Sequence, residues 1–215
     1  MAINIHSLIK SEKELSDNFV SLFKLCFKMH TRLLEYLNNN SINETTLEKF
    51  SIYKNKVTEL KNHIRDDCIW IISKDQPRST HLRYIIAILY SIKDLERISE
   101  YAYNIFYYSY KLEISDSYKK EMMTIISKSN ETFCSLMDMF EKNIVINLED
   151  LYMEEINKFK DFYKSFVKKN FSKLKLSADK NSDDFYQFSI MIKYTERTID
   201  HIESIFNNFI MIKSF

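Results

Sequence analysis

The sequence of 215 residues contains no glycine and a single proline, Pro77. Tight β-turns and the loops that wrap nucleotide phosphates depend on glycine, because glycine adopts positive φ at little steric cost. The absence of glycine argues against a β-rich fold and against a nucleotide site with a Walker-type loop. Long helices joined by short polar loops are the architecture that remains.

Cysteine and clustered charge are also scarce. The three cysteines, at positions 26, 68 and 134, form no C-x-x-C pair, so neither a disulfide framework nor a zinc knuckle is indicated. The formal net charge is +1, without the clustered basic face that nucleic acid requires. The longest apolar stretch is too short to span a bilayer, and the N-terminus runs into charged residues without the apolar region of a signal peptide. We therefore expect a cytoplasmic protein with no membrane insertion.

Apolar residues recur at steps of three, four and seven, which places them on one face of a helix. We predict six long helices, over about 8–37, 44–74, 77–113, 116–143, 148–175 and 182–213. Pro77 fits the first turn of the third helix, with Asp75 or Gln76 as its cap. Short loops imply antiparallel neighbours, so the predicted fold class is all-α, a helical bundle.

An internal repeat divides the chain. Residues 95–100 read LERISE and residues 195–200 read TERTID, at an offset of 100 residues, and both are followed by Ile-Phe at the same distance. The motif falls in the third helix and again in the sixth. We therefore predict two tandem three-helix units, 1–113 and 114–215.

Each motif carries two acids four residues apart. Helical spacing places Glu96 inside the apolar stripe of its helix and Glu100 at the edge, and it places Glu196 and Asp200 in the same way. Carboxylates on a core face are costly unless a cation or a metal is paired with them. Two interpretations stay open: solvated acids whose spacing is accidental, or a site for a hard cation with oxygen ligands from facing helices.

Residues 95–105, LERISEYAYNI, resemble the motif L-E-R-I-G-D-x-A-x-N-I that closes each three-helix repeat in the PhoU family. The second repeat keeps Glu196-Arg197 and Asp200-His201. The resemblance spans nearly the whole chain, and it is most specific between positions 64 and 105. Further similar segments precede the first motif: IRDDC at 64–68, QPR at 76–78 and LR at 82–83.

The resemblance implies a cytosolic accessory protein of the high-affinity phosphate ABC transporter. Members of the family restrain phosphate uptake and pass phosphate status to a sensor histidine kinase where one exists. They are not known as enzymes. From the resemblance we expect contacts with the ATPase subunit of the transporter, and a homodimer is compatible with it. Some members bind iron or zinc clusters through the acidic motifs.

This sequence departs from the family on its second helix, where Lys54 and Lys61 stand at positions that are frequently acidic. We expect Lys54, Lys61 or both to lie close to Glu96 and Glu100. An ammonium group there supplies the positive charge that a metal supplies elsewhere in the family. Metal binding in the first repeat should then be weak or absent.

For any divalent or ferric cation, iron or zinc, we expect Glu196 and Asp200 of the second repeat to be the site, although the fifth helix offers no assured third ligand. Arg97 and Arg197 flank the acids and are candidates for docking contacts or for pairing with a neighbouring helix. Two rival functions remain at this point: a carboxylate-bridged metal protein, and a helical adaptor in an unrelated pathway. The first rival needs four or more inward acids with His partners, and only the two acid pairs are found.

Overall fold

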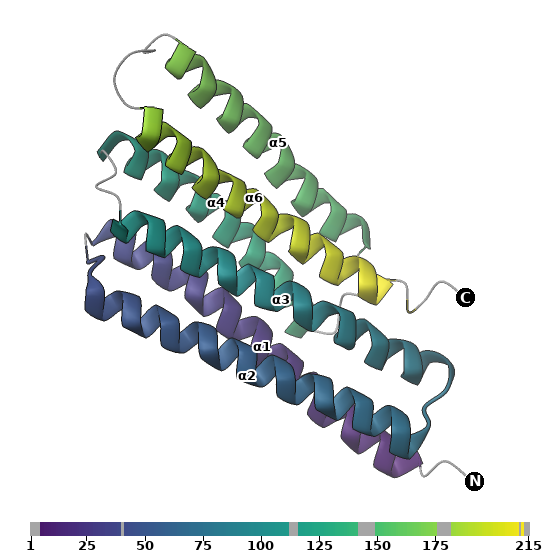
Figure 1. Cartoon of the computed structure of the whole chain (residues 1–215). Helices are drawn as coiled ribbons and strands as arrows, with labels where there is room; N and C mark the ends of the chain where they lie inside the picture. Colours follow the sequence, from purple (N-terminus) through teal and green to yellow (C-terminus); the bar gives the residue numbers. More distant parts are fainter. Residues whose placement is uncertain are drawn as a thin grey trace.

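The computed structural model describes residues 5–39, 41–111, 116–141, 149–175, 182–210 and 212. These residues form long α-helices and no strand (Figure 1). The predicted all-α class is confirmed, and so are the approximate bounds of the predicted helices. In chain order the elements are α1 (Ile5–Asn38), α2 (Glu44–Asp75), α3 (Ser79–Lys111), α4 (Asp116–Glu141), α5 (Glu149–Lys175) and α6 (Ser182–Ile210).

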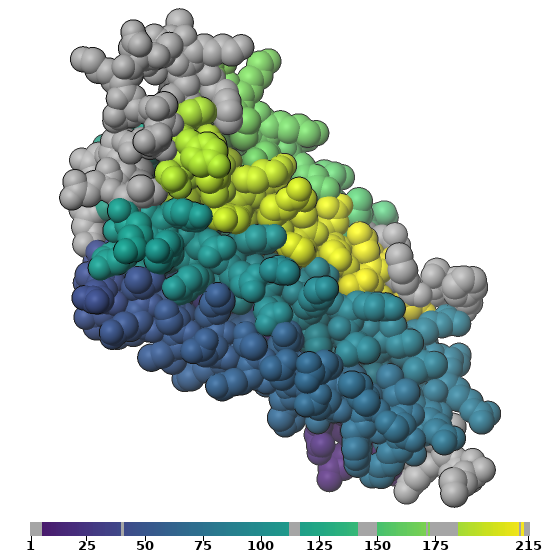
Figure 2. Space-filling view, in the orientation of Figure 1, coloured from purple at the N-terminus to yellow at the C-terminus, as the bar shows by residue number. Residues whose placement is uncertain are grey.

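The helices pack as two sets of three. Helices α1, α2 and α3 contact one another, and so do α4, α5 and α6. Helix α3 packs along α6, and α1 packs along α4, so these two contacts join the sets. Figure 2 shows the face on which α2, α3 and α6 lie side by side. The predicted unit boundary between 113 and 114 lies outside the described residues.

The start of α2 illustrates how the sequence fixes a helix end. The side chain of Asn43 accepts a hydrogen bond from the Thr46 amide at 3.0 Å, and the Thr46 hydroxyl accepts one from the Asn43 amide at 2.9 Å. This reciprocal capping box satisfies two amides that a helix leaves without intrahelical partners. The result is the predicted start of the helix near residue 44.

The link between α2 and α3 differs from the prediction. Helix α3 begins at Ser79, so Pro77 does not lie in its first turn, and Gln76 is the C-terminal cap of α2 rather than a cap of α3. Gln76 has φ 46°, the left-handed conformation that commonly ends a helix. A residue before proline is disfavoured in the right-handed helical region, which is why the helix stops there.

The predicted apolar stripe of α1 is buried along its whole length, from Leu8 to Leu37. It meets α4 through interlocking rings: the centroids of Phe23 and Phe133 are 5.3 Å apart, and those of Phe19 and Phe140 are 5.8 Å apart. Full burial of one such ring contributes on the order of 2–3 kcal/mol. The two sets of helices therefore share one core.

The contacts between the two sets repeat with partners exchanged. Tyr101 of α3 stacks on Tyr194 of α6 at 5.3 Å, and His201 of α6 bonds Asp94 of α3 at 2.7 Å. With the offset of 100 residues, Tyr101 corresponds to His201 and Tyr194 corresponds to Asp94. The second contact is therefore the first one with the two halves exchanged. This exchange is the signature of a pseudo-twofold relation between the halves. The 100-residue offset therefore relates contacts between the helices as well as the acid motif itself.

Candidate functional site

Glu96 lies in a closed polar cluster between α3 and α2. Lys61 Nζ is 2.7 Å from Glu96 Oε1, and each of these side chains is 20% exposed. The Thr58 hydroxyl donates a second hydrogen bond to the same oxygen at 3.2 Å. Burial raises the pKa of the nearby Cys26 thiol, and the charge of Glu96 raises it further. The carboxylate is therefore satisfied by a cation from the facing helix.

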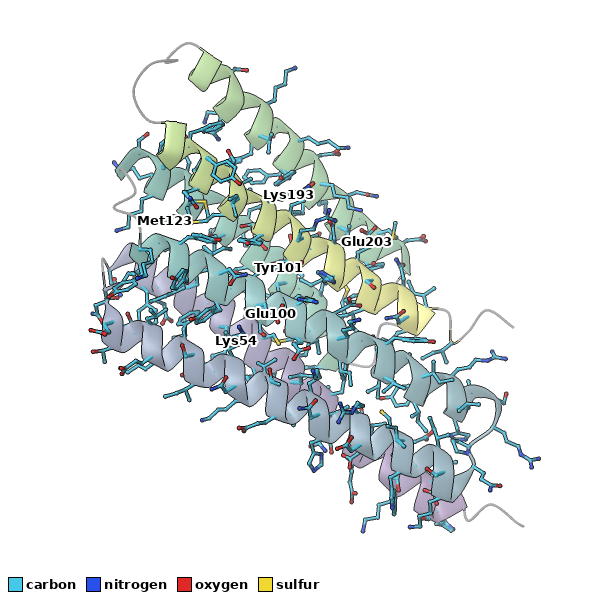
Figure 3. All side chains as sticks on the ribbon, in the orientation of Figure 1. Lys54, Glu100, Tyr101, Met123, Lys193 and Glu203 are labelled. Carbon is cyan, nitrogen blue, oxygen red and sulfur yellow. The ribbon has the colours of Figure 1, made fainter. Side chains whose placement is uncertain are left out.

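Glu100 and Lys54 make other contacts. Glu100 turns to Arg97 of its own helix at 2.6 Å, and Lys54 Nζ lies 4.8 Å from the centroid of the Tyr103 ring. Figure 3 labels Lys54 and Glu100 on the neighbouring helices α2 and α3. Of the two lysines expected beside the acids, the structure brings Lys61 to Glu96, and it places Lys54 over the aromatic face of Tyr103.

The second acid motif is arranged differently. Glu196 pairs with Lys193 of its own helix, and Asp200 pairs with Arg197, also of α6, at 3.2 Å. From α5, Tyr163 forms a hydrogen bond with Glu196. Burial raises the pKa of the Tyr163 hydroxyl, and the charge of Glu196 raises it further. A tyrosine thus faces the motif where the first half offers Lys61.

A cavity of about 170 Å³ lies beside this second motif. Lys160 of α5 pairs beyond the motif, because its Nζ lies 2.5 Å from Glu203 Oε2 (Figure 3 labels Glu203), and Lys164 pairs with Asp161 of its own helix at 3.7 Å. The second motif is therefore more open than the first. The cavity is lined by Phe159, Lys160, Tyr163, Lys164, Glu196, Ile199 and Asp200.

The predicted burial of Glu96 and Glu196 was wrong in degree, whereas Glu100 and Asp200 lie at the edge of the apolar stripe as predicted. Their side chains are 20% exposed for Glu96, 28% for Glu100, 27% for Glu196 and 36% for Asp200, so none of the four is in the core. The reason is the contact between α3 and α6, which the periodicity of one helix cannot show. That contact widens the buried arc of each helix on the side away from its acids and leaves the acids at the edge.

The fit of a metal ion to these motifs can be judged from the donors present. Within the part of the chain that the structure describes, no three His, Cys, Asp or Glu side chains gather in a way that could hold a metal. In the first half the Lys61 ammonium stands against Glu96, where it repels a second cation. The residues of the first motif therefore do not fit the metal clusters implied by the family resemblance. In the second half Glu196 and Asp200 supply two carboxylates, and the described residues add no third such ligand.

The flanking arginines pair within their own helices. Arg97 bonds Glu100, Arg197 bonds Asp200, and both arginine side chains are about half exposed. These ion pairs lie within α3 and within α6, so they do not support the predicted pairing with a neighbouring helix. The docking role stays a prediction.

One polar cluster escaped the sequence analysis. His201 Nδ1 lies 2.7 Å from Asp94 Oδ1, and the Tyr101 hydroxyl lies 3.3 Å from His201 Nε2. The imidazole thus bridges α3 and α6, with side chains that are only partly exposed. Positions 101 and 201 are equivalent in the repeat. The repeat offset was the one available signal that these positions meet, and it required knowing that α3 packs on α6.

The fold and the repeated acid motif define a class: all-helical proteins built from two three-helix units with an E-R-x-x-D/E motif at the end of each unit. Comparison with known proteins shows which family part of the chain is similar to. Residues 19–108 match the family model of the PhoU domain. This stretch is similar to the PhoU domain, and the resemblance predicted from the motifs is confirmed.

Two solved structures share the fold over almost the whole chain. PhoU from Pseudomonas aeruginosa has a TM-score of 0.77 and 18% identity, covering 94% of this chain and 97% of that one. The phosphate transport system regulatory protein PhoU from Streptococcus pneumoniae has a TM-score of 0.79 and 17% identity, covering 96% and 97%.

Two sequence relatives that match almost the whole chain occur in mycoplasmas. An uncharacterized protein of Mycoplasma pneumoniae is 28% identical, covering 99% of this chain and 97% of its own. An uncharacterized protein of Mycoplasma genitalium is 26% identical, covering 99% and 96%. Among the described residues, no helix combines the length and the apolar character that a membrane span requires.

Proposed function

We propose that this chain is a PhoU-like regulator of phosphate uptake and phosphate homeostasis. It acts in the cytoplasm through contacts with the ATPase subunit of a phosphate ABC transporter, and with a sensor histidine kinase where the cell has one. The observation that carries the proposal is the PhoU domain at residues 19–108, which contains the first acid motif. The shared fold of a protein named as a phosphate transport regulator supports it.

The site chemistry favours protein contacts over a carboxylate-bridged metal centre. Such a centre needs several inward acids with His partners, whereas the described acids lie at the helix edges and pair with Lys61, Lys193 and Arg197. Long helical surfaces are one kind of surface that partner proteins recognise. Regulation by docking therefore agrees best with the residues present.

The direct test is co-purification from the native cell. The full chain, tagged and expressed at its natural level, should retain the transporter ATPase subunit in phosphate-rich medium. Absence of that subunit in phosphate-rich and in phosphate-poor medium would contradict the proposal and leave the plain helical adaptor.

A variant locates the docking surface. The double substitution Arg97→Ala and Arg197→Ala removes two half-exposed guanidinium groups and only surface ion pairs, so it should cost little stability. It should reduce the retained ATPase subunit several-fold if these arginines dock. Lys10→Ala, at a lysine that is 78% exposed on α1, is the matched control and should retain the subunit. Equal retention by both variants would reject the arginines and keep the partner.

A further inference from the structure

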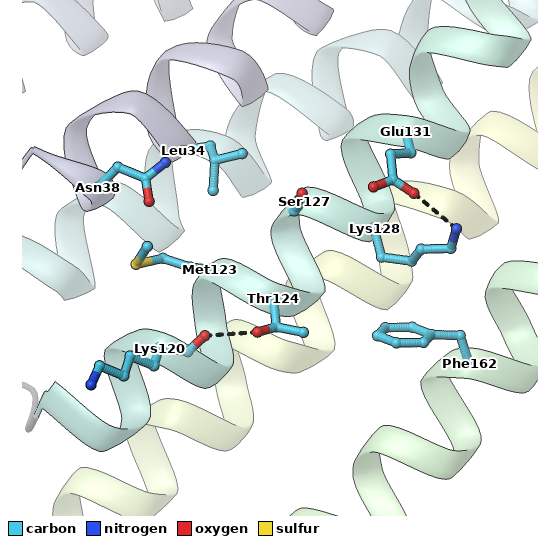
Figure 4. A pocket seen from close by; sticks show the side chains of 9 residues that line it. All are labelled: Leu34, Asn38, Lys120, Met123, Thr124, Ser127, Lys128, Glu131 and Phe162. Carbon is cyan, nitrogen blue, oxygen red and sulfur yellow. Dashed lines mark hydrogen bonds and ion pairs between the residues drawn. The ribbon is translucent and has the colours of Figure 1, made fainter.

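A groove of about 590 Å³ runs along α4, between α1 on one side and α5 on the other (Figure 4). In the described chain, α1 and α5 do not contact each other, although both contact α4. The surface of α4 between them therefore has no covering helix. The groove is lined by Leu34, Asn38, Lys120, Met123, Thr124, Ser127, Lys128, Glu131 and Phe162.

The length and shape of the groove are suited to binding an α-helix. Its floor follows one face of α4 from Lys120 to Glu131, which is about three helical turns or roughly 16 Å. In the middle of this floor stand the short side chains of Thr124 and Ser127, which allow another backbone to approach. Apolar walls rise on both sides, with Leu34 from α1 and Phe162 from α5 (Figure 4).

The equivalent surface of the first half is filled. With the offset of 100 residues, positions 24, 27 and 28 of α1 correspond to 124, 127 and 128. Lys24 pairs with Glu141 at 2.8 Å, and the Phe27 ring packs 5.2 Å from that of Phe133. Lys28 lies 5.6 Å from the Tyr53 ring. Where the first half has a phenylalanine, the second half has Ser127, and the missing ring leaves space in the groove.

The charge around the groove is positive. Lys120 is exposed at one end, and Lys128 pairs with Glu131 at 2.9 Å near the other. On α5, the exposed Lys169 lies seven positions after Phe162, about two turns along the same face. The residues that line the groove include two lysines and one glutamate, and this net positive charge favours an occupant with acidic flanks.

We propose that this groove binds an amphipathic α-helix of about three turns, presented by a partner protein, with apolar anchors on one face and acidic residues beside them. Helices of this kind seat i, i+3/i+4 and i+7 side chains in an apolar groove. The proposal extends the proposed function, regulation through protein contacts, and it does not depend on which protein supplies the helix.

Labelled peptides of about fourteen residues test the proposal with the full chain, measured by fluorescence anisotropy. The first has leucine anchors and glutamate flanks, the second has the same anchors with lysine flanks, and the third has serine in place of leucine with glutamate flanks. The first should bind saturably, with a dissociation constant about tenfold lower than that of the second. The third should not bind.

Substitutions locate the binding to the groove. Ser127→Phe restores the ring of the first half and should abolish binding of the leucine–glutamate peptide. Ser172→Phe places the same ring on an exposed position of α5 that does not line the groove, and should leave binding unchanged. Lys120→Glu should weaken the same peptide several-fold and strengthen the lysine-flanked one. Because Lys120 is exposed, this variant keeps the test valid even if Ser127→Phe unfolds, which circular dichroism would show.

Three outcomes would overturn the proposal. Equal binding of the first two peptides would mean that the positive rim is irrelevant. Binding unchanged by Ser127→Phe and Lys120→Glu would place the peptide elsewhere. A homodimer that Ser127→Phe dissociates in sedimentation would make a second copy of this chain the occupant. If the peptide binds as expected while no transporter ATPase co-purifies, the groove stands and the proposed function fails; co-purification without peptide binding gives the reverse result.

Discussion

The two acid motifs of this chain occupy equivalent positions and are neutralised in different ways. In the first half, Glu96 is bound across the helix interface by Lys61. In the second half, Glu196 pairs with Lys193 of its own helix and faces Tyr163 beside a cavity of about 170 Å³. The sequence of the motif alone does not decide how its glutamate is neutralised, because the residue opposite that glutamate comes from the facing helix.

The packing of the facing helices differs in parallel. Helix α2 packs extensively along both α1 and α3, whereas α5 packs less extensively on α4 and α6 (Figure 1). A closely packed α2 allows Lys61 to reach the acid with little exposure. A more loosely held α5 leaves space beside the second motif, and also leaves the groove over α4.

The prediction with the largest expected effect compares the packing of the two halves at equivalent positions, Phe106 and Phe206. Phe106 stacks on Phe50 with centroids 4.4 Å apart, and Phe206 stacks on Tyr152 at 4.2 Å. Phe106→Ala and Phe206→Ala should each lower the free energy of unfolding by about 3–5 kcal/mol, through lost burial and the cavity left behind. Urea denaturation followed by circular dichroism measures both. A cost for Phe206→Ala below about half that for Phe106→Ala would show that the looser packing reaches the core.

A second prediction uses a titratable residue that the other half lacks. His30 is buried and bonds the Ile98 carbonyl at 3.0 Å, and position 130 carries asparagine. Burial lowers the pKa of His30 from 6.5 to about 4, partly offset by the hydrogen bond to Ile98. Since the unfolded chain takes up the proton near pH 6.5 and the folded chain does so only near pH 4, this contribution to stability is present above pH 6.5. It is lost as the pH falls through this window, by about 3 kcal/mol in full.

The control for this prediction is His30→Asn, which places the residue of the second half in the first. Its free energy of unfolding should lose less than that of the natural chain between pH 6.5 and 4. Because carboxylates titrate in both proteins, the difference between the two curves is the quantity to compare. Parallel curves would mean that His30 accepts its proton in the folded state without penalty.

The ion pairs of the two motifs should differ in their contribution to stability. Glu96→Gln leaves the Lys61 ammonium, which is only 20% exposed, without its counter-charge and should cost about 1–2 kcal/mol. Glu196→Gln breaks a pair within one helix whose lysine is 54% exposed, and it should cost under about 0.5 kcal/mol. Unfolding in urea at low and high salt would reveal the difference. Equal costs would remove the distinction drawn between a closed and an open motif.

The smallest expected effect concerns cations. Among the described residues, the two carboxylates of the second motif pair with Lys193 and Arg197 of their own helix, whereas Glu96 pairs with Lys61 of the facing helix, so a divalent or ferric ion should bind more tightly at the second motif than at the first. A cation at a concentration equal to its dissociation constant adds only about 0.4 kcal/mol of stability. Thermal unfolding with and without added zinc should show a small stabilisation that Glu196→Gln abolishes and Glu96→Gln leaves intact. If Glu96→Gln alone abolished the stabilisation by zinc, the cation site would lie at the first motif instead of the second.

Much of this architecture could be predicted from sequence, because it depends on local patterns. The missing glycine excluded turn-rich folds, and the stripe from Leu8 to Leu37 on α1 proved buried throughout. The repeat offset identified the equivalent acids. The pairing of Lys61 with Glu96 followed from comparing the family pattern with this sequence, since a lysine at an acidic position needs a counter-charge nearby.

The rest depended on packing between helices. The burial of Glu96 was overestimated because periodicity along α3 does not show that α6 covers another side. The bridge from Asp94 through His201 joins residues 107 positions apart, and no local signal connects them. The link at Gln76 and Pro77 was misassigned because the end of one helix and the start of the next compete for the same residues.

Phosphate uptake by the cell tests the central claim most directly. Initial uptake of labelled phosphate should be measured in phosphate-rich medium in cells with the gene, without it, and with it restored. If the chain restrains a phosphate transporter, uptake rises several-fold when the gene is deleted and returns to its original rate when the gene is restored. Uptake that is the same in all three strains would contradict the assignment as a regulator of phosphate transport.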